Sequence, residues 1–243
     1  MQLVRLICLA PLALGACAPA STDYPIIVGG GGGMGGGQGM DGGTTTDGPV
    51  DLLLGRVCLL DDLRDFSSCD TSAAGNITVS LPGVPSATTI ADGGFQIQVP
   101  NGSNLVWSLS GASIVSSTYG FGISTQIPAI AQPAFDTLYA NNGVLEDESS
   151  GAIFGQVFQA NVPAVGATVA STPEGSYPVF YASTSDPDVW SANATTTFGS
   201  FWLPGLQPGA VSLAFLGSGA GSAEIDAGQT VGSNAVTFVT FGL

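Results

Sequence analysis

Short runs of alternating apolar and polar residues recur along the chain from Asp51 onward. In the clearest run, Phe95, Ile97 and Val99 alternate with two glutamines, and three others follow the same period, at 105–109, 211–215 and 236–240. A period of two places successive side chains on opposite faces of a β-strand. Because these runs are short and are separated by Gly, Pro, Asn and Ser, the pattern predicts an all-β fold of the sandwich type.

Two local features complete this outline. Pro100-Asn101-Gly102 lies between two alternating runs and predicts a turn, because Asn and Gly tolerate a positive φ. The stretch from Pro133 to Asn141 predicts a short helix, with Pro133 in the first helical position and Asn142-Gly143 at its end. We therefore expect helix to be a minor component.

The chain also resembles itself. Gly55-Arg56-Val57 precedes Phe95 by about the same distance as Gly155-Gln156-Val157 precedes Phe201, and each Phe follows a glycine-containing turn. This self-similarity predicts a duplicated fold, with a first module over 51–145 and a second over 146–243. A single larger sandwich made from both halves is the alternative.

The second module carries a series of short motifs that fit one known family. They are Gly155-Gln156-Val157 as an opening strand, a Gly-Ala-x-Val strand within 163–169, a Gly-x-Phe hairpin within 197–203 and a Leu-x-Pro-Gly turn at 206–209. In this order they resemble the carboxypeptidase regulatory-like domain, a prealbumin-like (Ig-like) β-sandwich. The first module keeps fewer of the matching positions, namely Gly55, Val57, Gly75, Thr78, Val79, Thr89, Asp92, Gly94 and Phe95. Because the family is a non-catalytic accessory fold, the resemblance implies architecture and no enzymatic activity.

The first sixteen residues have the form of an export signal. Arg5 is followed by an apolar stretch up to Leu14 and by the small residues Gly15 and Ala16. Together with Cys17, these residues resemble the lipobox of bacterial lipoproteins, which implies cleavage before Cys17 and lipidation of its sulfur. Ala18 is not the Asp that retains such proteins at the inner membrane, so the resemblance implies an outer-membrane lipoprotein of the bacterial envelope, facing the periplasm or the surface. An ordinary signal peptide that leaves a soluble periplasmic protein is the alternative.

Residues 17–50 predict a disordered, flexible Gly-rich linker behind the lipidated cysteine. They hold glycine runs at 29–33 and 35–37 and few apolar anchors, so they bury too little surface to offset the entropy of ordering. A phosphate-binding loop is the other interpretation of such glycines, but no Lys-Ser or Lys-Thr follows them. We expect the folded part to stand off the membrane on this linker.

The charge excludes one class of partner. The whole chain has a formal net charge of −15. Beyond the signal, its eighteen carboxylates are balanced by only two basic residues, Arg56 and Arg64. A chain this acidic has no electrostatic reason to bind nucleic acid. It also contains no histidine and no lysine, which removes His-ligated zinc, Ser-His and Cys-His pairs and Schiff-base chemistry.

The four cysteines differ in their expected roles. Cys8 leaves with the signal, Cys17 is the lipidation site, and Cys58 and Cys69 remain as a pair in an exported chain. Such a pair predicts a structural disulfide.

Carboxylates are the remaining candidates for chemistry. They group at Asp61, Asp62, Asp65 and Asp70, at 146–148, and at Asp186 with Asp188. A carboxylate-dependent glycan hydrolase is the one enzyme class they permit, and Ca²⁺ is the one metal they suit, although no Asp-x-Asp-x-Asp-Gly loop is present. We expect solvated loops, no catalytic residues, no cofactor and no resident metal.

Aromatic residues offer a further hypothesis. Trp190 lies beside Asp186 and Asp188 in an expected loop, and an exposed ring there would suit stacking against a sugar. The leading interpretation is therefore an envelope lipoprotein that acts as a non-catalytic structural or interaction module, with a polysaccharide or a protein as partner. The alternatives are a carbohydrate-binding module, with Trp190, Asp186 and Asp188 at its site, and the hydrolase.

Overall fold

The structure is a computed structural model of the chain, and it describes residues 50–70, 73–100, 105–119, 126–217 and 223–242. The predicted signal at 1–16, Cys17, the linker up to position 49 and Asn101-Gly102 of the predicted turn lie outside the described residues. The elements are β1 (Val50–Leu60), β2 (Cys69–Asp70), β3 (Thr78–Ser80), β4 (Ala87–Thr88), β5 (Gly94–Pro100), β6 (Trp107–Ser110), β7 (Ser116–Tyr119), β8 (Gln126–Ala129), α1 (Gln132–Asn141), β9 (Gly151–Gln159), β10 (Val162–Pro163), β11 (Thr168–Thr172), β12 (Phe180–Tyr181), β13 (Ser200–Leu206), β14 (Gly209–Leu216), β15 (Ala223–Val231) and β16 (Ala235–Gly242).

The all-β prediction is confirmed, and the strands form sandwich-type sheets. The alternating runs become strands with one buried face: in β5, Phe95, Ile97 and Val99 are buried while Gln96 and Gln98 are exposed. The predicted helix is α1, which has a proline in its first turn and ends at Asn141, followed by Asn142 as the C-cap and by Gly143 with a φ of 67°. Local sequence therefore accounts for these elements.

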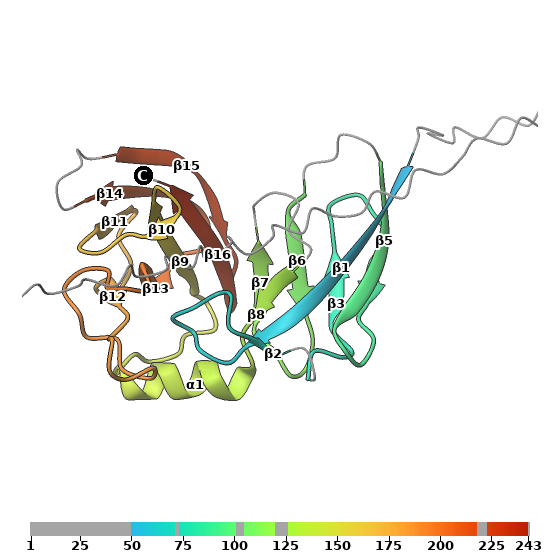
Figure 1. Ribbon diagram of the computed structural model, residues 1–243, viewed down its shortest axis with the longest axis horizontal. Coiled ribbons are helices and arrows are strands. Elements are labelled where there is room, and N and C mark those ends of the chain that lie inside the picture. Colours follow the sequence, from blue (N-terminus) through green and yellow to red (C-terminus); the bar gives the residue numbers. More distant parts are fainter. Residues whose placement is uncertain (1–49, 71–72, 101–104, 120–125, 218–222, 243) are drawn as a thin grey trace, which may run out of the picture.

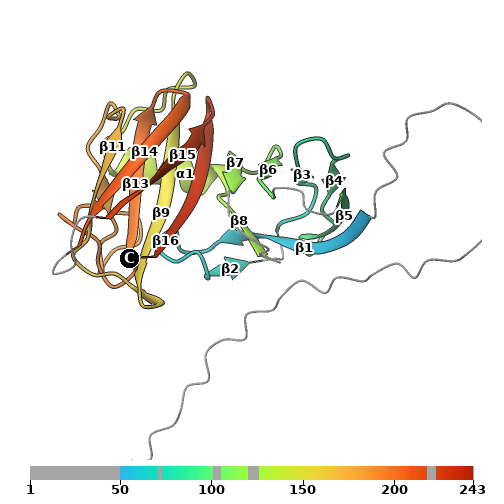
Figure 2. The same ribbon diagram turned by 90° about the horizontal axis from the view of Figure 1, so that it is seen from above.

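The same pattern of strand pairing occurs twice along the chain. In the first half, β1 pairs antiparallel with β5 and in parallel with β8, while β6 pairs antiparallel with β3 and β7. In the second half, β9 pairs antiparallel with β13 and in parallel with β16, while β14 pairs antiparallel with β11 and β15. Figures 1 and 2 show the two halves side by side.

The repeat extends to single residues. Gly55 lies opposite Phe95 in the first half and Gly155 lies opposite Phe201 in the second. In both pairs the aromatic ring covers the glycine so closely that an added Cβ would overlap it. Only glycine leaves room for the ring at these two positions.

A buried threonine is repeated in the same way. The hydroxyl of Thr89 accepts a hydrogen bond from the N–H of Ile77 at 2.9 Å and donates one to a carbonyl at 2.6 Å. In the second half the hydroxyl of Thr195 accepts from the N–H of Ala167 at 2.9 Å and donates to a carbonyl at 2.7 Å. Each threonine thereby satisfies buried backbone groups of a neighbouring loop. The module boundaries at 51–145 and 146–243 stay a prediction, but the repeated contacts show that both halves are built alike.

The two halves share one sheet. Its order is β12-β13-β9-β16-β7-β6-β3-β4, and the junction is the parallel pairing of β16 with β7, where Val236 lies opposite Ser117. β16 also pairs with β9, so it lies in the interior of the sheet (Figure 1). Both faces of β16 are covered, because Val236 and Phe238 lie in one hydrophobic cluster and Val239 and Phe241 lie in another. Consecutive residues Val236 to Val239 are therefore all buried rather than alternating.

Three hydrophobic clusters stabilise this arrangement. One fills the first half around Ile77, Phe95 and Trp107, and one fills the second half around Phe201 and Phe215. The third combines residues from both halves with α1, including Leu60, Leu63, Phe135, Leu138, Phe154, Trp202 and Phe238. Figure 1 shows α1 below β12 and β13 of the second half, with one end toward β8.

Candidate functional site

The disulfide loop of the first half contacts the second half. Cys58 and Cys69 are bonded, which confirms the predicted pair. Between them, Leu63 is buried in the cluster shared by both halves, and the ring of Phe66 packs edge-on against Phe238 at a centroid distance of 5.3 Å. We call residues 61–69 the stapled loop.

Arg64 is the centre of this contact. Its Nη1 donates a hydrogen bond to the carbonyl of Ser183 at 3.0 Å, and its guanidinium lies 4.4 Å from the ring centroid of Phe198. Its own carbonyl accepts hydrogen bonds from the Ser200 hydroxyl and from Nε2 of Gln156, the latter at 3.1 Å. Side chain and backbone of one residue therefore contact three separate segments of the second half.

Asp62 orients the guanidinium of Arg64. Its two carboxylate oxygens accept three hydrogen bonds from Nε and Nη2 of Arg64 at 2.7–3.1 Å. Burial raises the pKa of Asp62, but the hydrogen bonds and positive charge of Arg64 outweigh burial, so this pKa lies below its usual range. Asp62 is thus a structural partner of Arg64.

The acidic loop at 183–190 approaches the same arginine. The carboxylates of Asp186 and Asp188 act electrostatically on Arg64 and raise its pKa, after the larger effect of the Asp62 hydrogen bonds. Asp186 Oδ1 also accepts the N–H of Asp188 at 2.9 Å. Sequence reasoning singled out these carboxylates, but it did not place them around Arg64.

Trp190 corrects the sugar-stacking hypothesis. It is 1% exposed and packs edge-on against Phe154 and Trp202, with centroid distances of 5.7 and 6.4 Å. Its backbone N–H donates to Oδ1 of Asn142 at 2.8 Å, and its indole N–H donates to the Pro187 carbonyl at 3.1 Å. The expectation of an exposed ring is wrong, because Trp190 belongs to the core beneath α1.

Two further carboxylates, Asp65 and Asp147, form local turns. Asp65 Oδ1 accepts the backbone N–H of Ser67 at 2.9 Å and its hydroxyl at 2.6 Å. Asp147 binds Ser149 in the same way, and these hydrogen bonds lower the pKa of Asp147. Within the described residues, no group of three or more acidic or cysteine side chains is arranged to hold a metal ion.

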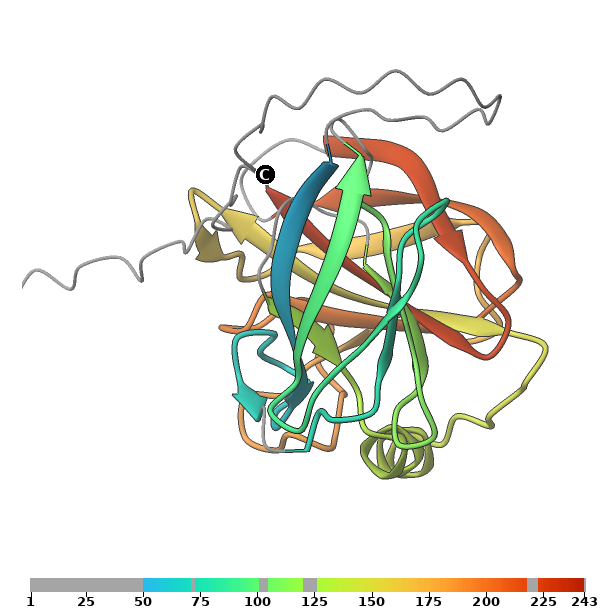
Figure 3. The same ribbon diagram turned by 90° about the vertical axis from the view of Figure 1, so that its right-hand side faces the viewer.

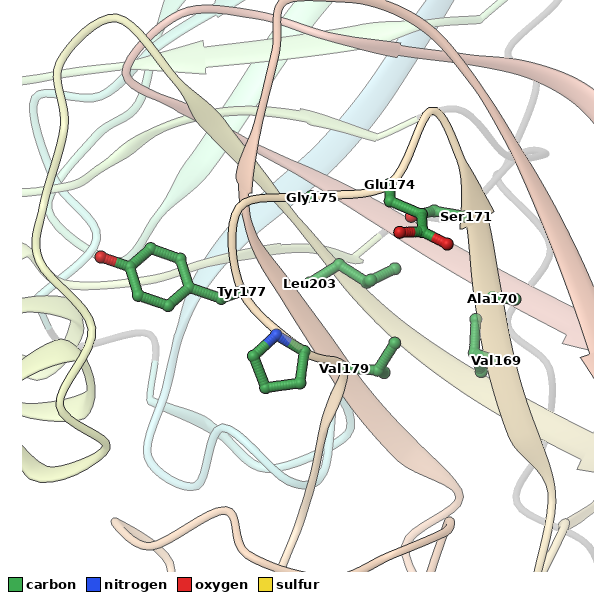
Figure 4. A pocket seen from close by; sticks show the side chains of 9 residues that line it. Val169, Ala170, Ser171, Glu174, Gly175, Tyr177, Val179 and Leu203 are labelled. Atoms are coloured by element: carbon green, nitrogen blue, oxygen red, sulfur yellow. The ribbon is translucent and has the colours of Figure 1, made fainter.

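A shallow groove of about 370 Å³ lies between β11 and the segment 174–179 (Figure 4). Glu174 and Ser171 lie at one end, and Val169, Val179 and Leu203 lie along its floor. Tyr177 points away, and its hydroxyl accepts the N–H of Leu145 at 3.0 Å. One carboxylate above an apolar floor provides neither the paired acid and base of a glycosidase nor an aromatic platform for a sugar.

Comparisons with known proteins identify no family for this chain. No family model and no curated protein matches the chain. Solved structures similar to it include the minor pilin GBS52 of Streptococcus agalactiae (11% identity over 78% of this chain and 94% of that one, TM-score 0.24). Others are the shaft pilin SpaA of Lactobacillus rhamnosus GG (10%, 78% and 96%, 0.24) and a family 41 carbohydrate-binding module from streptococcal virulence factors (9%, 76% and 93%, 0.27). With TM-scores this low, the function has to be argued from the chain's own residues.

The described residues contain no helix that could span a membrane. α1 has ten residues, and among the helices of the described ranges none reaches the length and apolarity that crossing a bilayer requires.

Proposed function

We propose that the chain is a bacterial envelope lipoprotein whose folded part is a non-catalytic structural module, carried on a Gly-rich linker. Leu14-Gly15-Ala16-Cys17 supports the anchor. The structural role is supported by the junction, where the shared sheet, the shared core and the stapled loop join two similar halves. We further propose that each half is a prealbumin-like sandwich of the carboxypeptidase regulatory-like type.

The chemistry of the chain supports a non-catalytic role. Without histidine or lysine, a hydrolase would depend on its carboxylates. Asp62 is bonded to Arg64, and Asp65, Asp147 and Asp186 accept hydrogen bonds within their own turns. These carboxylates serve the loops in which they lie.

Labelling with radioactive palmitate tests the anchor. We expect label in the wild type, none in Cys17→Ser, and undiminished label in Cys8→Ser, the matched control within the signal. Treating intact cells with a nonspecific protease in the same experiment shows which face of the membrane the module occupies. An unlabelled wild type would refute the lipoprotein proposal and leave a secreted or periplasmic protein.

The partner, an envelope polysaccharide or protein, stays a prediction. A glycan array probed with the folded protein separates the two. Saturable binding to one glycan class would replace the structural proposal with the carbohydrate-binding one. Absence of binding together with a cross-linked envelope protein would support a structural or interaction role.

A further inference from the structure

β5 is an edge strand with backbone groups that face outward. It pairs with β1 on one side, and no strand of the described chain pairs with its other side. The Gly94 carbonyl accepts the N–H of Ile90 at 2.9 Å, so Gly94 faces away from β1. Because residues of an antiparallel strand face alternate sides, Gln96 and Gln98 also direct their N–H and C=O groups to the open side. The backbone groups of Gly94 are already bonded to Ile90 and Asp92, so the outward groups of Gln96 and Gln98 are the template for another strand.

The open side of β5 borders an apolar groove. Two hollows of about 450 and 360 Å³ lie between β5 and the segment 83–90, and both are lined by Gln96. Three large apolar side chains around them are exposed, namely Val50 at 53%, Leu54 at 38% and Ile90 at 66%. Figure 3 shows β1 and β5 side by side at the end of the molecule that faces away from the second half. The edge therefore offers both hydrogen-bonding groups and apolar surface to an extended segment.

The chain itself contains a segment that fits this edge. Between Cys17 and Val50, the run Tyr24-Pro25-Ile26-Ile27-Val28 is the one stretch of consecutive large apolar residues. Tyr, Ile and Val favour extended backbone. Pro25 has no N–H, and proline is tolerated in an edge strand where that position faces solvent. An added strand with Pro25 facing outward would direct the backbone groups of Tyr24, Ile26 and Val28 toward β5.

The linker is long enough for the segment to reach the open edge of β5. Residues 29–49 connect it to Val50, which pairs with Pro100 at one end of β5 and itself lines the groove. A Gly-rich stretch of this length has a root-mean-square reach of about 25 Å, and a seven-residue strand spans about 23 Å. A segment held this close has an effective concentration of roughly millimolar, which favours it over a free partner.

We propose that Tyr24–Val28 docks on the open edge of β5 as an added strand. Docking itself does not require a lipid on Cys17. Its effect on the distance between the module and the membrane rests on the proposed lipoprotein function. With an anchor at Cys17, the docked form leaves residues 18–23 as the spacer and holds the module against the membrane. The undocked form lets the module stand off on the whole linker. The spacing between Cys17 and the module thus has two values, and docking of Tyr24–Val28 determines which one applies.

Amide hydrogen exchange of the full mature chain, with Cys17→Ser to keep it in solution, tests the docking. We expect the amides of Gln96 and Gln98 to exchange about tenfold more slowly in this chain than in the same chain with Ile26→Asp. Met40→Asp places the same charge elsewhere in the linker and should leave both amides protected. The amide of Ile97, which faces β1, should be protected in every variant and reports that the fold is intact.

Three results would overturn the proposal. Rapid exchange of Gln96 and Gln98 in the parent chain would mean that nothing covers the edge. Protection that survives Ile26→Asp would mean that another segment covers it. Protection that falls on dilution would assign the edge to a second copy of the chain. Palmitate labelling of Cys17 is independent of all three results, so the docking and the lipoprotein proposal can fail separately.

Discussion

Replacing Arg64 with alanine should loosen the contact between the two halves. The variant removes the hydrogen bond to the Ser183 carbonyl, the stacking on Phe198 and the ion pair with Asp62. It keeps the backbone carbonyl of residue 64, which accepts hydrogen bonds from Gln156 and Ser200. The loss therefore reports on the side chain of Arg64 alone.

The size of the effect follows from these contacts. A hydrogen bond from a charged donor contributes about 1.5–3 kcal/mol, and a partly buried cation–π contact contributes about 1 kcal/mol. The ion pair adds about 1 kcal/mol, because the side chains of Arg64 and Asp62 are only 11% and 25% exposed and water screens them less than a surface pair. We expect Arg64→Ala to lower the free energy of unfolding by about 3–5 kcal/mol.

Urea denaturation measures this difference, and the chain provides a matched control. Arg56 is the other arginine of the described residues, and it forms an ion pair with Asp92 at 3.2 Å, with side chains 47% and 55% exposed. Arg56→Ala removes the same side chain from an exposed site and should change the free energy of unfolding by less than about 1 kcal/mol. Arg64→Lys should lose most of the contribution, because an ammonium cannot reproduce the planar fork of the guanidinium.

Equal losses for Arg64→Ala and Arg56→Ala would refute the reasoning. They would mean that Arg64 contributes no more than an exposed charge and that other contacts hold the stapled loop. A biphasic transition in Arg64→Ala with a single transition in the wild type would support it further, because it would show the halves unfolding separately.

Three further predictions concern single features of the fold. Gly155→Ala should destabilise the protein by about 1–3 kcal/mol, because its Cβ would overlap the aromatic ring packed against it, whereas Gly242→Ala, with open space around it, should be nearly neutral in thermal melting. Replacing both cysteines of the Cys58–Cys69 disulfide with alanine should lower stability by about 3 kcal/mol in urea titrations, and an unchanged urea midpoint would contradict a stabilising role. Because Arg64 holds the pKa of Asp62 below its usual value of 3.8, the ionised carboxylate stabilises the fold above that pH and this contribution is lost as the pH falls through the lowered pKa. Asp62→Asn should therefore be less stable than the wild type at pH 7, and this difference should shrink as the pH falls below 3.8. A difference independent of pH would argue against the linkage.

The sequence predicted those elements whose formation depends on near neighbours. The alternation in β5 and β14 reflects one buried face, and α1 carries its own boundaries in Pro133 and Asn142. The paired glycines and aromatics were also visible, since Gly155 and Phe201 recur in the positions of Gly55 and Phe95.

What the sequence did not predict depends on contacts between distant segments. β16 becomes an interior strand only because β7 and β9 flank it, and no local pattern specifies that pairing. Trp190 was expected to be exposed because acidic residues and a proline precede it. It is buried because its ring packs against Phe154 and Trp202, and Asn142, next to the end of α1, accepts its backbone N–H. Arg64 gave no local sign that its guanidinium would reach Ser183, which is far along the chain.

The position of β16 in the sequence also determines when the shared sheet can be completed during folding. Every other described strand precedes it in the chain, yet the two halves join in one sheet only through its pairing with β7. When the chain emerges with its N-terminus first, β1 to β8 can form early. β7 then keeps an unpaired edge until residues 235–242 are available. Because this closing contact joins segments far apart in sequence, it should be slow to form. The interval before it forms is when an incomplete molecule is most exposed to pairing with a neighbour through that edge.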